Sequence, residues 1–141
     1  MRFMMIMFPG PNAEKGVMPE EKLLAEMGKY NEELVKAGVL LAGEGLQPSS
    51  KGARVHFGGG KPTVSDGPFT ETKEIIGGFW IIQVKSKEEA IQWATRCPAP
   101  GGEMIEIRQI FEAEDFAPAD PTGELRKKEQ ELREIAASRG R

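Results

Sequence analysis

The sequence predicts one α+β domain built on an antiparallel sheet and followed by a charged helical extension. Three observations support this fold class. Short apolar runs bounded by Gly and Pro alternate with segments of helical periodicity. Their order along the chain is strand, helix, strand with a hairpin, strand, helix, strand. The length of 141 residues suits one well-packed domain rather than two.

The first half of the chain is predicted to hold two strands and one helix. Arg2 to Phe8 forms a strand that is apolar on both faces and ends at Pro9. A helix is expected from near Pro19 to Gly38, because its apolar residues recur at helical spacing. Val39 to Leu46 returns to strand character, and its glycines permit bends.

The second half repeats the pattern after a hairpin. Its predicted segments are a hairpin (54–57 and 62–64), a strand (79–84), a helix that begins with a capping box at 86–89 and ends before Pro98, and a strand (104–111). In the last strand Ile105, Ile107 and Phe111 share one face, while Glu106 and Arg108 share the other.

This order is the split β-α-β arrangement of ferredoxin-like domains, in which both helices cover one face of the sheet. The strands at 2–8 and 79–84 carry large apolar side chains on both sides, so the other face is too apolar to remain in water. Since the chain offers no third layer, the simplest cover is the same face of a second copy. The sequence therefore predicts a homodimer with a shared cleft.

The composition changes beyond the last strand. We assign residues 1–111 to the domain and 112–141 to a charged C-terminal extension. Ala117 to Pro121 is interpreted as a linker, and Glu124 to about Ser138 as a helix whose narrow apolar stripe is Leu125, Leu132 and Ile135. A solvated helix laid across the dimer is favoured over a functional tail.

Charge and cysteine content exclude several classes of protein. The 19 basic and 22 acidic residues give a net charge of −3, which offers no general attraction for nucleic acid or an anionic membrane. No apolar run approaches the roughly 20 residues that a membrane helix requires. Cys97 is the only cysteine, so an internal disulfide is impossible and a reducing compartment fits. We expect a soluble, cytoplasmic protein.

The turn Asp66-Gly67-Pro68-Phe69 is the first candidate for a functional site. Gly67 is sterically free, Pro68 locks its own φ, and the result is a rigid turn that carries a carboxylate. Asp66 in such a turn beside a cleft is suited to act as a general base or to anchor a substrate. The alternative is that Asp66 only caps the turn through its backbone amides.

Charged residues after the turn extend this candidate site. Glu71, Lys73 and Glu74 either pair on the surface, which is the favoured interpretation, or fold inward and bind a small polar ligand. Glu106 and Arg108 face the predicted cleft, where they either fix the dimer or let Arg108 bind an anion.

The remaining candidates are assigned more limited roles. Glu44 is expected to join the Glu106 and Arg108 pair from a neighbouring strand, and Tyr30 to place its hydroxyl at the rim of the cleft. We assign catalytic roles to Asp66, Glu74 and Arg108, as base or anchor, orienting carboxylate and anion clamp, and ligand-binding roles to Glu44, Glu71, Lys73, Glu106 and Tyr30.

No metal and no cofactor are expected. Glu44, Asp66, Glu71 and Glu74 offer oxygen ligands, but no His or Cys spacing supports a transition-metal site. Cys97 is interpreted as a small buried hydrophobe and His56 as a surface strand residue.

A series of short motifs resembles the YCII-related family, in its DGPF-containing branch. The resemblance spans Arg2 to Phe111 and rests on six motifs in order: Gly43-Glu44-Gly45-Leu46-Gln47-Pro48, Asp66-Gly67-Pro68-Phe69-Thr70-Glu71-Thr72-Lys73-Glu74, Gly78-Phe79-Trp80, Glu89-Ala90-Ile91, Arg96-Cys97-Pro98 and Glu106-Ile107-Arg108. It implies a dimeric α+β barrel of ferredoxin-like subunits and no settled activity. The proposal that the wider family is enzymatic depends on a His and an Asp in a cleft, whereas His56 lies in the hairpin outside any matching motif.

Two functions follow as hypotheses. The leading one is a homodimer that binds a small polar or anionic metabolite and transforms it, if at all, without a cofactor. The alternative is a non-catalytic sensor or interaction module, because proteins that the chain resembles are sometimes fused to, or encoded beside, extracytoplasmic-function sigma factors.

Overall fold

The computed structural model describes residues 1–140 and divides the chain into two compact units, Met1–Ile110 and Phe111–Arg141. The first unit holds the sheet, and the second holds a long helix. In chain order the elements are β1 (Arg2–Phe8), α1 (Pro11–Glu14), α2 (Glu21–Lys36), β2 (Leu40–Gly45), the 3-10 helix η1 (Ser49–Lys51), β3 (Ala53–His56), β4 (Thr63–Asp66), η2 (Thr72–Glu74), β5 (Gly78–Gln83), α3 (Lys87–Thr95), β6 (Met104–Gln109), η3 (Ala113–Ala119) and α4 (Glu124–Arg139).

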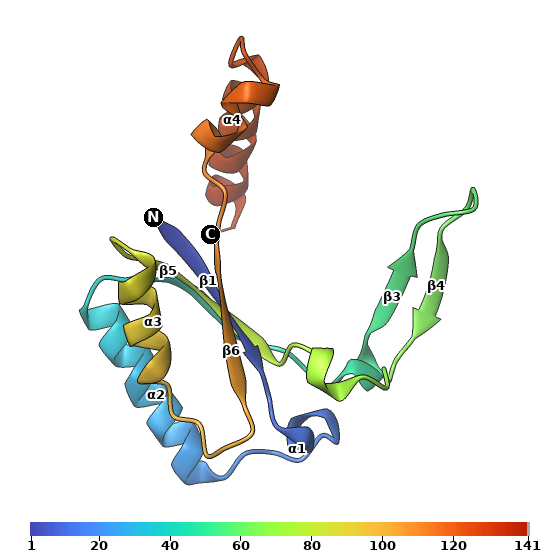
Figure 1. Ribbon diagram of the computed structural model, residues 1–141, viewed down its shortest axis with the longest axis vertical. Coiled ribbons are helices and arrows are strands. Elements are labelled where there is room, and N and C mark those ends of the chain that lie inside the picture. The colour runs from blue at the N-terminus through green and yellow to red at the C-terminus, as the bar shows by residue number, and fades with distance from the viewer. Residues whose placement is uncertain (141) are drawn as a thin grey trace. The chain divides into compact units, whose positions relative to one another are not determined.

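Four strands form an antiparallel sheet in the order β2-β5-β1-β6, and β3 and β4 pair separately as a two-stranded ribbon. β1 and β2 run parallel with β5 between them, which is the split β-α-β arrangement. The helices α2 and α3 lie side by side against one face of the sheet (Figure 1). The predicted α+β, ferredoxin-like fold is therefore confirmed.

The core lies between this sheet and its two helices. Strand residues 3, 5, 80 and 82 point toward the helices, since side chains alternate along each strand. Tyr30 on α2 meets the Trp80 ring edge to face, with 5.8 Å between ring centroids. The buried apolar residues are Phe3, Met5, Tyr30, Leu34, Val39, Trp80, Ile82, Val84 and Ala90.

The other side of the sheet, which we call the open face, carries large apolar side chains that α2 and α3 do not cover. They belong to the two central strands and are only half-buried: Met4, Ile6, Phe8, Phe79 and Ile81. The register places Ile6 between Phe79 and Glu106 and places Met4 opposite Arg108. The two-sided apolar character read in residues 2–8 and 79–84 thus corresponds to one buried face and one open face.

Local interactions explain where α3 and β6 begin and end. The Ser86 hydroxyl accepts from the Glu89 N–H at 3.1 Å and caps α3, as predicted, but the Glu89 carboxylate accepts from the Lys85 N–H rather than completing the capping box. β6 ends at Gln109. Phe111 therefore does not share a strand face with Ile105 and Ile107, because it begins the second unit.

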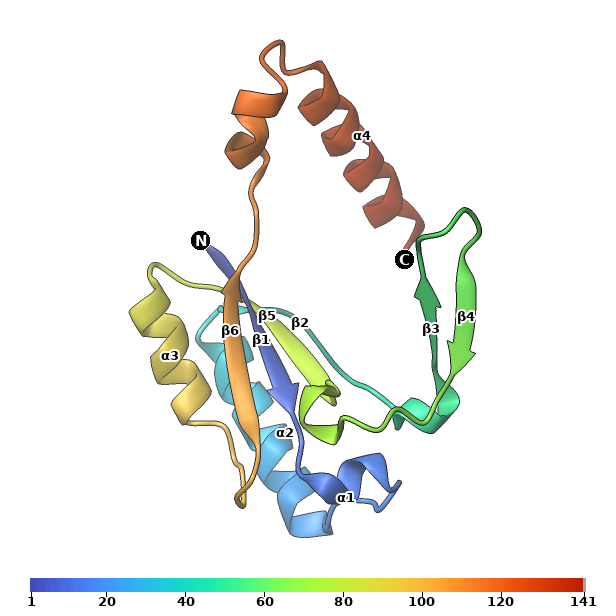
Figure 2. The same cartoon turned by 45° about the vertical axis from the view of Figure 1, so that its right-hand side comes forward.

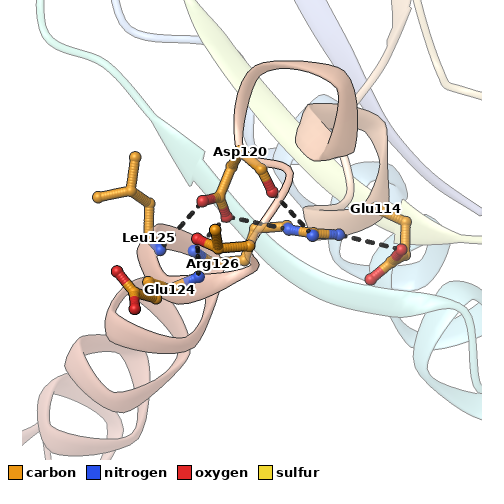
Figure 3. A network of polar contacts seen from close by, with 6 residues as sticks. Glu114, Asp120, Glu124, Leu125 and Arg126 are labelled. Atoms are coloured by element: carbon orange, nitrogen blue, oxygen red, sulfur yellow. Dashed lines mark hydrogen bonds and ion pairs between the residues drawn. The ribbon is translucent and has the colours of Figure 1, made fainter.

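The second unit contains a helix start where the sequence predicts a linker. Residues 113–119 form η3, and the Asp120 carboxylate accepts from the backbone N–H groups of Leu125 at 3.3 Å and Arg126 at 3.0 Å (Figure 3). These are orphan donors of the first turn of α4, so Asp120 caps this helix from outside it. The Arg126 guanidinium also bonds Asp120 at 3.1 Å and Glu114 at 3.2 Å.

Among the described residues, no helix combines the length and the apolarity that crossing a bilayer requires.

Candidate functional site

The Asp66-Gly67-Pro68-Phe69 turn is fastened to the first unit through Ser49. The Ser49 hydroxyl accepts from the Phe69 N–H at 3.0 Å and donates to the Glu14 carboxylate, which also accepts from the Ser49 N–H at 2.7 Å. Gly67 donates its N–H to the Gly52 carbonyl at 3.0 Å. A Cβ at Gly67 would lie 1.7 Å from the Ser49 carbonyl oxygen, so only glycine fits there. The turn thus joins the ribbon to α1 and η1.

The charged residues of the turn region point into solvent. Asp66 ends β4 opposite Ala53, and Glu71, Lys73 and Glu74 are all exposed. Within the part of the chain that the structure describes, none of these four side chains has an ion pair or a hydrogen-bond partner. Residues 1–140 also contain no group of three His, Cys, Asp or Glu side chains arranged to hold a metal ion.

Glu106 and Arg108 form an ion pair on the open face. Arg108 Nη1 lies 3.3 Å from Glu106 Oε2, with the side chains 71% and 44% exposed. A pair this exposed contributes only about 0 to 1 kcal/mol to stability. Glu44 shares the face but lies on β2, at the opposite edge of the sheet from β6. It is therefore not on a neighbouring strand, because β5 and β1 separate the two edges.

Tyr30 lies elsewhere than expected. It is 3% exposed, and its hydroxyl donates to the Trp93 carbonyl at 2.7 Å, between α2 and α3. Burial raises the pKa of Tyr30 far above its ordinary value, so the phenol stays neutral. Tyr30 is thus a core residue that joins the two helices, not a residue at the rim of a cleft on the open face.

The only His and the only Cys occupy simple environments. His56 is exposed on β3, with its Nε2 3.3 Å from the Ser65 hydroxyl. Cys97 packs beside the core, and burial raises the pKa of its thiol to about 11. The thiol is therefore protonated at neutral pH, as its interpretation as a small hydrophobe requires.

A groove lies between α2 and the end of the sheet formed by β2 and β5, on the side of the helices. Its volume is about 220 Å³. The groove exists because the glycines of these strands place no side chains in it. A Cβ built at Gly45 would have no heavy atom within 4 Å, and a Cβ built at Gly43 would lie 3.1 Å from the Trp80 ring. Its lining residues are Met7, Met27, Asn31, Gly43, Glu44, Gly45, Gly77, Gly78, Phe79 and Trp80.

Asn31 is the polar side chain that α2 contributes to this groove. Trp80 Nε1 donates to Asn31 Oδ1 at 2.9 Å, and because an indole N–H only donates, this bond fixes which way the amide points. The two N–H donors of Asn31 Nδ2 have no acceptor among the described residues. Glu44 contributes backbone, since the register directs its side chain to the open face with Phe79.

Neither Asn31 nor Ser49 is among the site residues predicted from the sequence. The available signal was the repetition of glycine at positions 43, 45, 77 and 78, which marks strands that leave space beside them.

Comparison with known proteins gives a family for this chain. The profile of the YCII-related domain matches residues 1–117. An uncharacterised protein of Rhizobium meliloti (strain 1021) is 33% identical over 75 residues, which are 53% of this chain. The match spans 60% of that relative's length. Because the profile covers most of the sequence, the chain belongs to the YCII-related domain family.

Proposed function

We propose that the protein is a small-molecule-binding homodimer and that the groove beside α2 holds the ligand. The observation that carries this proposal is the Asn31 amide, which Trp80 holds in one orientation and whose two N–H donors have no acceptor within residues 1–140. A fixed donor at the wall of a preformed apolar groove is the usual arrangement for recognising one polar group of a ligand.

The lining of the groove favours a particular class of ligand. Two N–H donors suit an oxygen acceptor such as a carbonyl or carboxylate, and Met7, Met27 and Trp80 suit an apolar body. The volume of about 220 Å³ lies below the range of roughly 300 to 1,000 Å³ typical of drug-sized ligands. The groove therefore fits a small metabolite with an apolar part and one carbonyl or carboxylate end.

The groove supports binding more directly than catalysis. Among the described residues that line the groove, Glu44 is the one ionisable residue, and its side chain faces the other side of the sheet. General acid or base chemistry requires a titratable side chain within hydrogen-bond reach of the reacting group. We therefore assign the groove a recognition role and leave Asp66, Glu74 and Arg108 outside it.

A pair of glycine substitutions tests the groove. Gly45→Leu places a side chain into the open space, whereas Gly28→Leu places the same side chain on an exposed position of α2 where nothing lies within 4 Å. In a thermal-shift screen of small carboxylic and carbonyl metabolites, Gly28→Leu should keep the hits of the natural protein and Gly45→Leu should lose them. Equal responses of the two variants would place the ligand elsewhere.

Asn31→Asp tests the polar contact separately. The new carboxylate keeps an acceptor for Trp80 Nε1 but replaces two donors by a negative charge. Affinity for a carboxylate ligand should fall about a hundredfold or more, because the donors are lost and a like charge takes their place. Retained affinity would exclude Asn31 from recognition.

The dimer is proposed from the open face of the sheet. Five large apolar side chains on β1 and β5 remain half-buried there, beside the Glu106–Arg108 pair. The same face of a second copy, related by a twofold axis, would cover them and enclose the pair. In this arrangement Arg108 either orders the interface or meets an anion in the shared cleft.

A second candidate function, an interaction module, is favoured by the surface of α4. Leu125, Leu132 and Ile135 form its narrow apolar stripe and are 68%, 52% and 47% exposed. A helix with such a stripe is suited to dock on another protein. Leu132→Glu should abolish partner binding without changing ligand binding in the groove if the module is the correct function.

A further inference from the structure

The β3–β4 ribbon is amphipathic, and its apolar side is uncovered. Val55 pairs with Val64, and both lie on the same side of the ribbon, opposite to the side that carries Arg54 and His56. Val55 is 52% exposed, Val64 67% and Phe57, at the tip, 83%. An alternating apolar and polar pattern is typical of strands with one covered face, so this ribbon lacks its cover.

The ribbon projects from a fixed base. Figures 1 and 2 both show it standing away from the four-stranded sheet of the same unit. At the base, Ser49 holds the Phe69 N–H and Glu14, and the Arg54 guanidinium lies 3.8 Å from the centre of the Phe69 ring. A two-stranded ribbon alone is marginally stable in water, so a rigidly mounted one needs a surface to pack on.

Charge indicates which surface covers the apolar side of the ribbon. The segment from Lys51 to Ser65 carries Lys51, Arg54 and Lys61 and no carboxylate. Arg54 lies on the polar side of the ribbon against Phe69, so the charge argument rests on Lys51 and Lys61. The open face of the sheet is mainly apolar, and its charged side chains are Arg2, Glu44, Glu106 and Arg108. Arg2 has a partner and Glu106 pairs with Arg108, so Glu44 is the one without a partner among the described residues. A basic, apolar ribbon and an apolar face with a free carboxylate are complementary.

We propose that the ribbon is an arm that packs through Val55, Phe57 and Val64 on the β2 edge of the open face of a second copy, beside Glu44, while Ile6 and the Glu106–Arg108 pair lie in the contact between the two open faces. The inference rests on the homodimer proposed above and adds a surface to it. Each copy supplies one arm and one open face, so a twofold pair covers both kinds of uncovered apolar surface. The Asp66-Gly67-Pro68-Phe69 turn then serves to set the direction of the arm.

Matched substitutions on adjacent residues of β4 test the arm. Val64→Lys places a charge on the apolar side, and Thr63→Lys places the same charge on the other side of the same strand. Phe57→Ser is a second arm variant, and because Phe57 lies outside the paired residues it leaves the ladder intact. The readout is the dimer dissociation constant of the full chain, from sedimentation velocity over a concentration series.

Val64→Lys and Phe57→Ser should each raise the dissociation constant about tenfold or more, while Thr63→Lys changes it little. The β3 and β4 amides of the natural protein should also gain protection from hydrogen exchange as concentration rises through the dissociation constant. Both results together support the arm.

Several outcomes would overturn it, and they separate it from the proposed function. If Ile6→Lys on the open face dissociates the dimer but Val64→Lys and Phe57→Ser do not, the arm is wrong and the dimer stands. If the natural chain is monomeric at every concentration, the dimer fails together with the arm, while ligand binding in the groove is tested independently by Gly45→Leu. Protection of β3 and β4 that does not depend on concentration also contradicts the arm.

Discussion

Ser49 connects three segments that are distant in the sequence. It is 8% exposed, and its hydroxyl links the Phe69 amide to the Glu14 carboxylate. Ser49→Ala removes this acceptor and leaves the Phe69 N–H without a partner, which should cost about 1 to 3 kcal/mol of unfolding free energy. Urea unfolding followed by tryptophan fluorescence measures the loss.

Ser50→Ala is the matched control, because Ser50 is exposed in the same 3-10 helix. It should change the unfolding free energy by only a few tenths of a kcal/mol. A loss of similar size in the two variants would mean that the Ser49 hydroxyl has no special role.

Glu14 makes this connection dependent on pH. The Ser49 hydroxyl first, and then the Ser49 backbone N–H, lower the pKa of Glu14 from its ordinary value of 4.5. A group with a lowered folded pKa contributes stability that is complete above the unfolded pKa and is lost as pH falls through the folded pKa. Stability of the natural protein should therefore fall more steeply than that of Glu14→Gln between about pH 5 and about pH 3.

Urea midpoints of both proteins across that range provide the measurement. Parallel curves for the natural protein and Glu14→Gln would contradict the assignment, because the other carboxylates are common to the two proteins.

At the level of elements, most of the fold could be predicted from apolar periodicity. Apart from the four-residue α1, which was not predicted, the strands and helices of the first unit follow the predicted bounds within two residues. The short 3-10 helices could not be predicted in this way. Their positions depend on bonds between distant residues, such as that of Ser49 to Glu14, which no local pattern encodes.

The candidate site was less predictable than the fold. Tyr30 and Asn31 are neighbours on one helix, yet one is a core residue and the other lines the groove. A helical repeat indicates which residues face the sheet but not where glycines on another strand leave space beside them. The prominent charges of the Asp66 turn, in contrast, are conspicuous in sequence and lie in solvent.

The start of α4 gives a prediction for a single element. Asp120 accepts from two backbone N–H groups of its first turn, and the Arg126 backbone N–H is the largest cause of the lowered pKa of Asp120. Asp120→Ala should therefore speed hydrogen exchange of the first-turn amides of α4 and reduce helical circular dichroism. Asp120→Asn should have a smaller effect, because it keeps an acceptor.

Thr122→Ala is the control for this element. Its hydroxyl lies 3.4 Å from the Glu124 N–H, at the weak end of hydrogen bonding. Exchange rates in α4 that respond equally to Thr122→Ala and Asp120→Ala would remove Asp120 as the principal cap.

At the scale of the whole molecule, the groove, the open face and the β3–β4 ribbon differ in whether they require a second copy of the chain. The groove is preformed within one chain and requires no partner. The open face and the β3–β4 ribbon each leave apolar side chains uncovered, and the described part of the first unit has no further layer to cover them. The proposed ligand binding and the proposed dimerisation should therefore be separable, so that a substitution affects one without the other.

The last prediction concerns the open face itself. Ile6 lies at its centre, between Phe79 and Glu106, so Ile6→Lys leaves a solvated charge in the monomer but buries one in the dimer. The variant should be monomeric by native mass spectrometry at concentrations where the natural protein is dimeric, with its groove still able to bind ligand. Leu24→Lys, on an exposed position of α2, should remain dimeric. A dimer that survives Ile6→Lys would show that the two copies meet through another surface. The ligand affinity of Arg108→Ala would then be compared with that of the natural protein. Equal affinities would mean that Arg108 contacts only its neighbour Glu106.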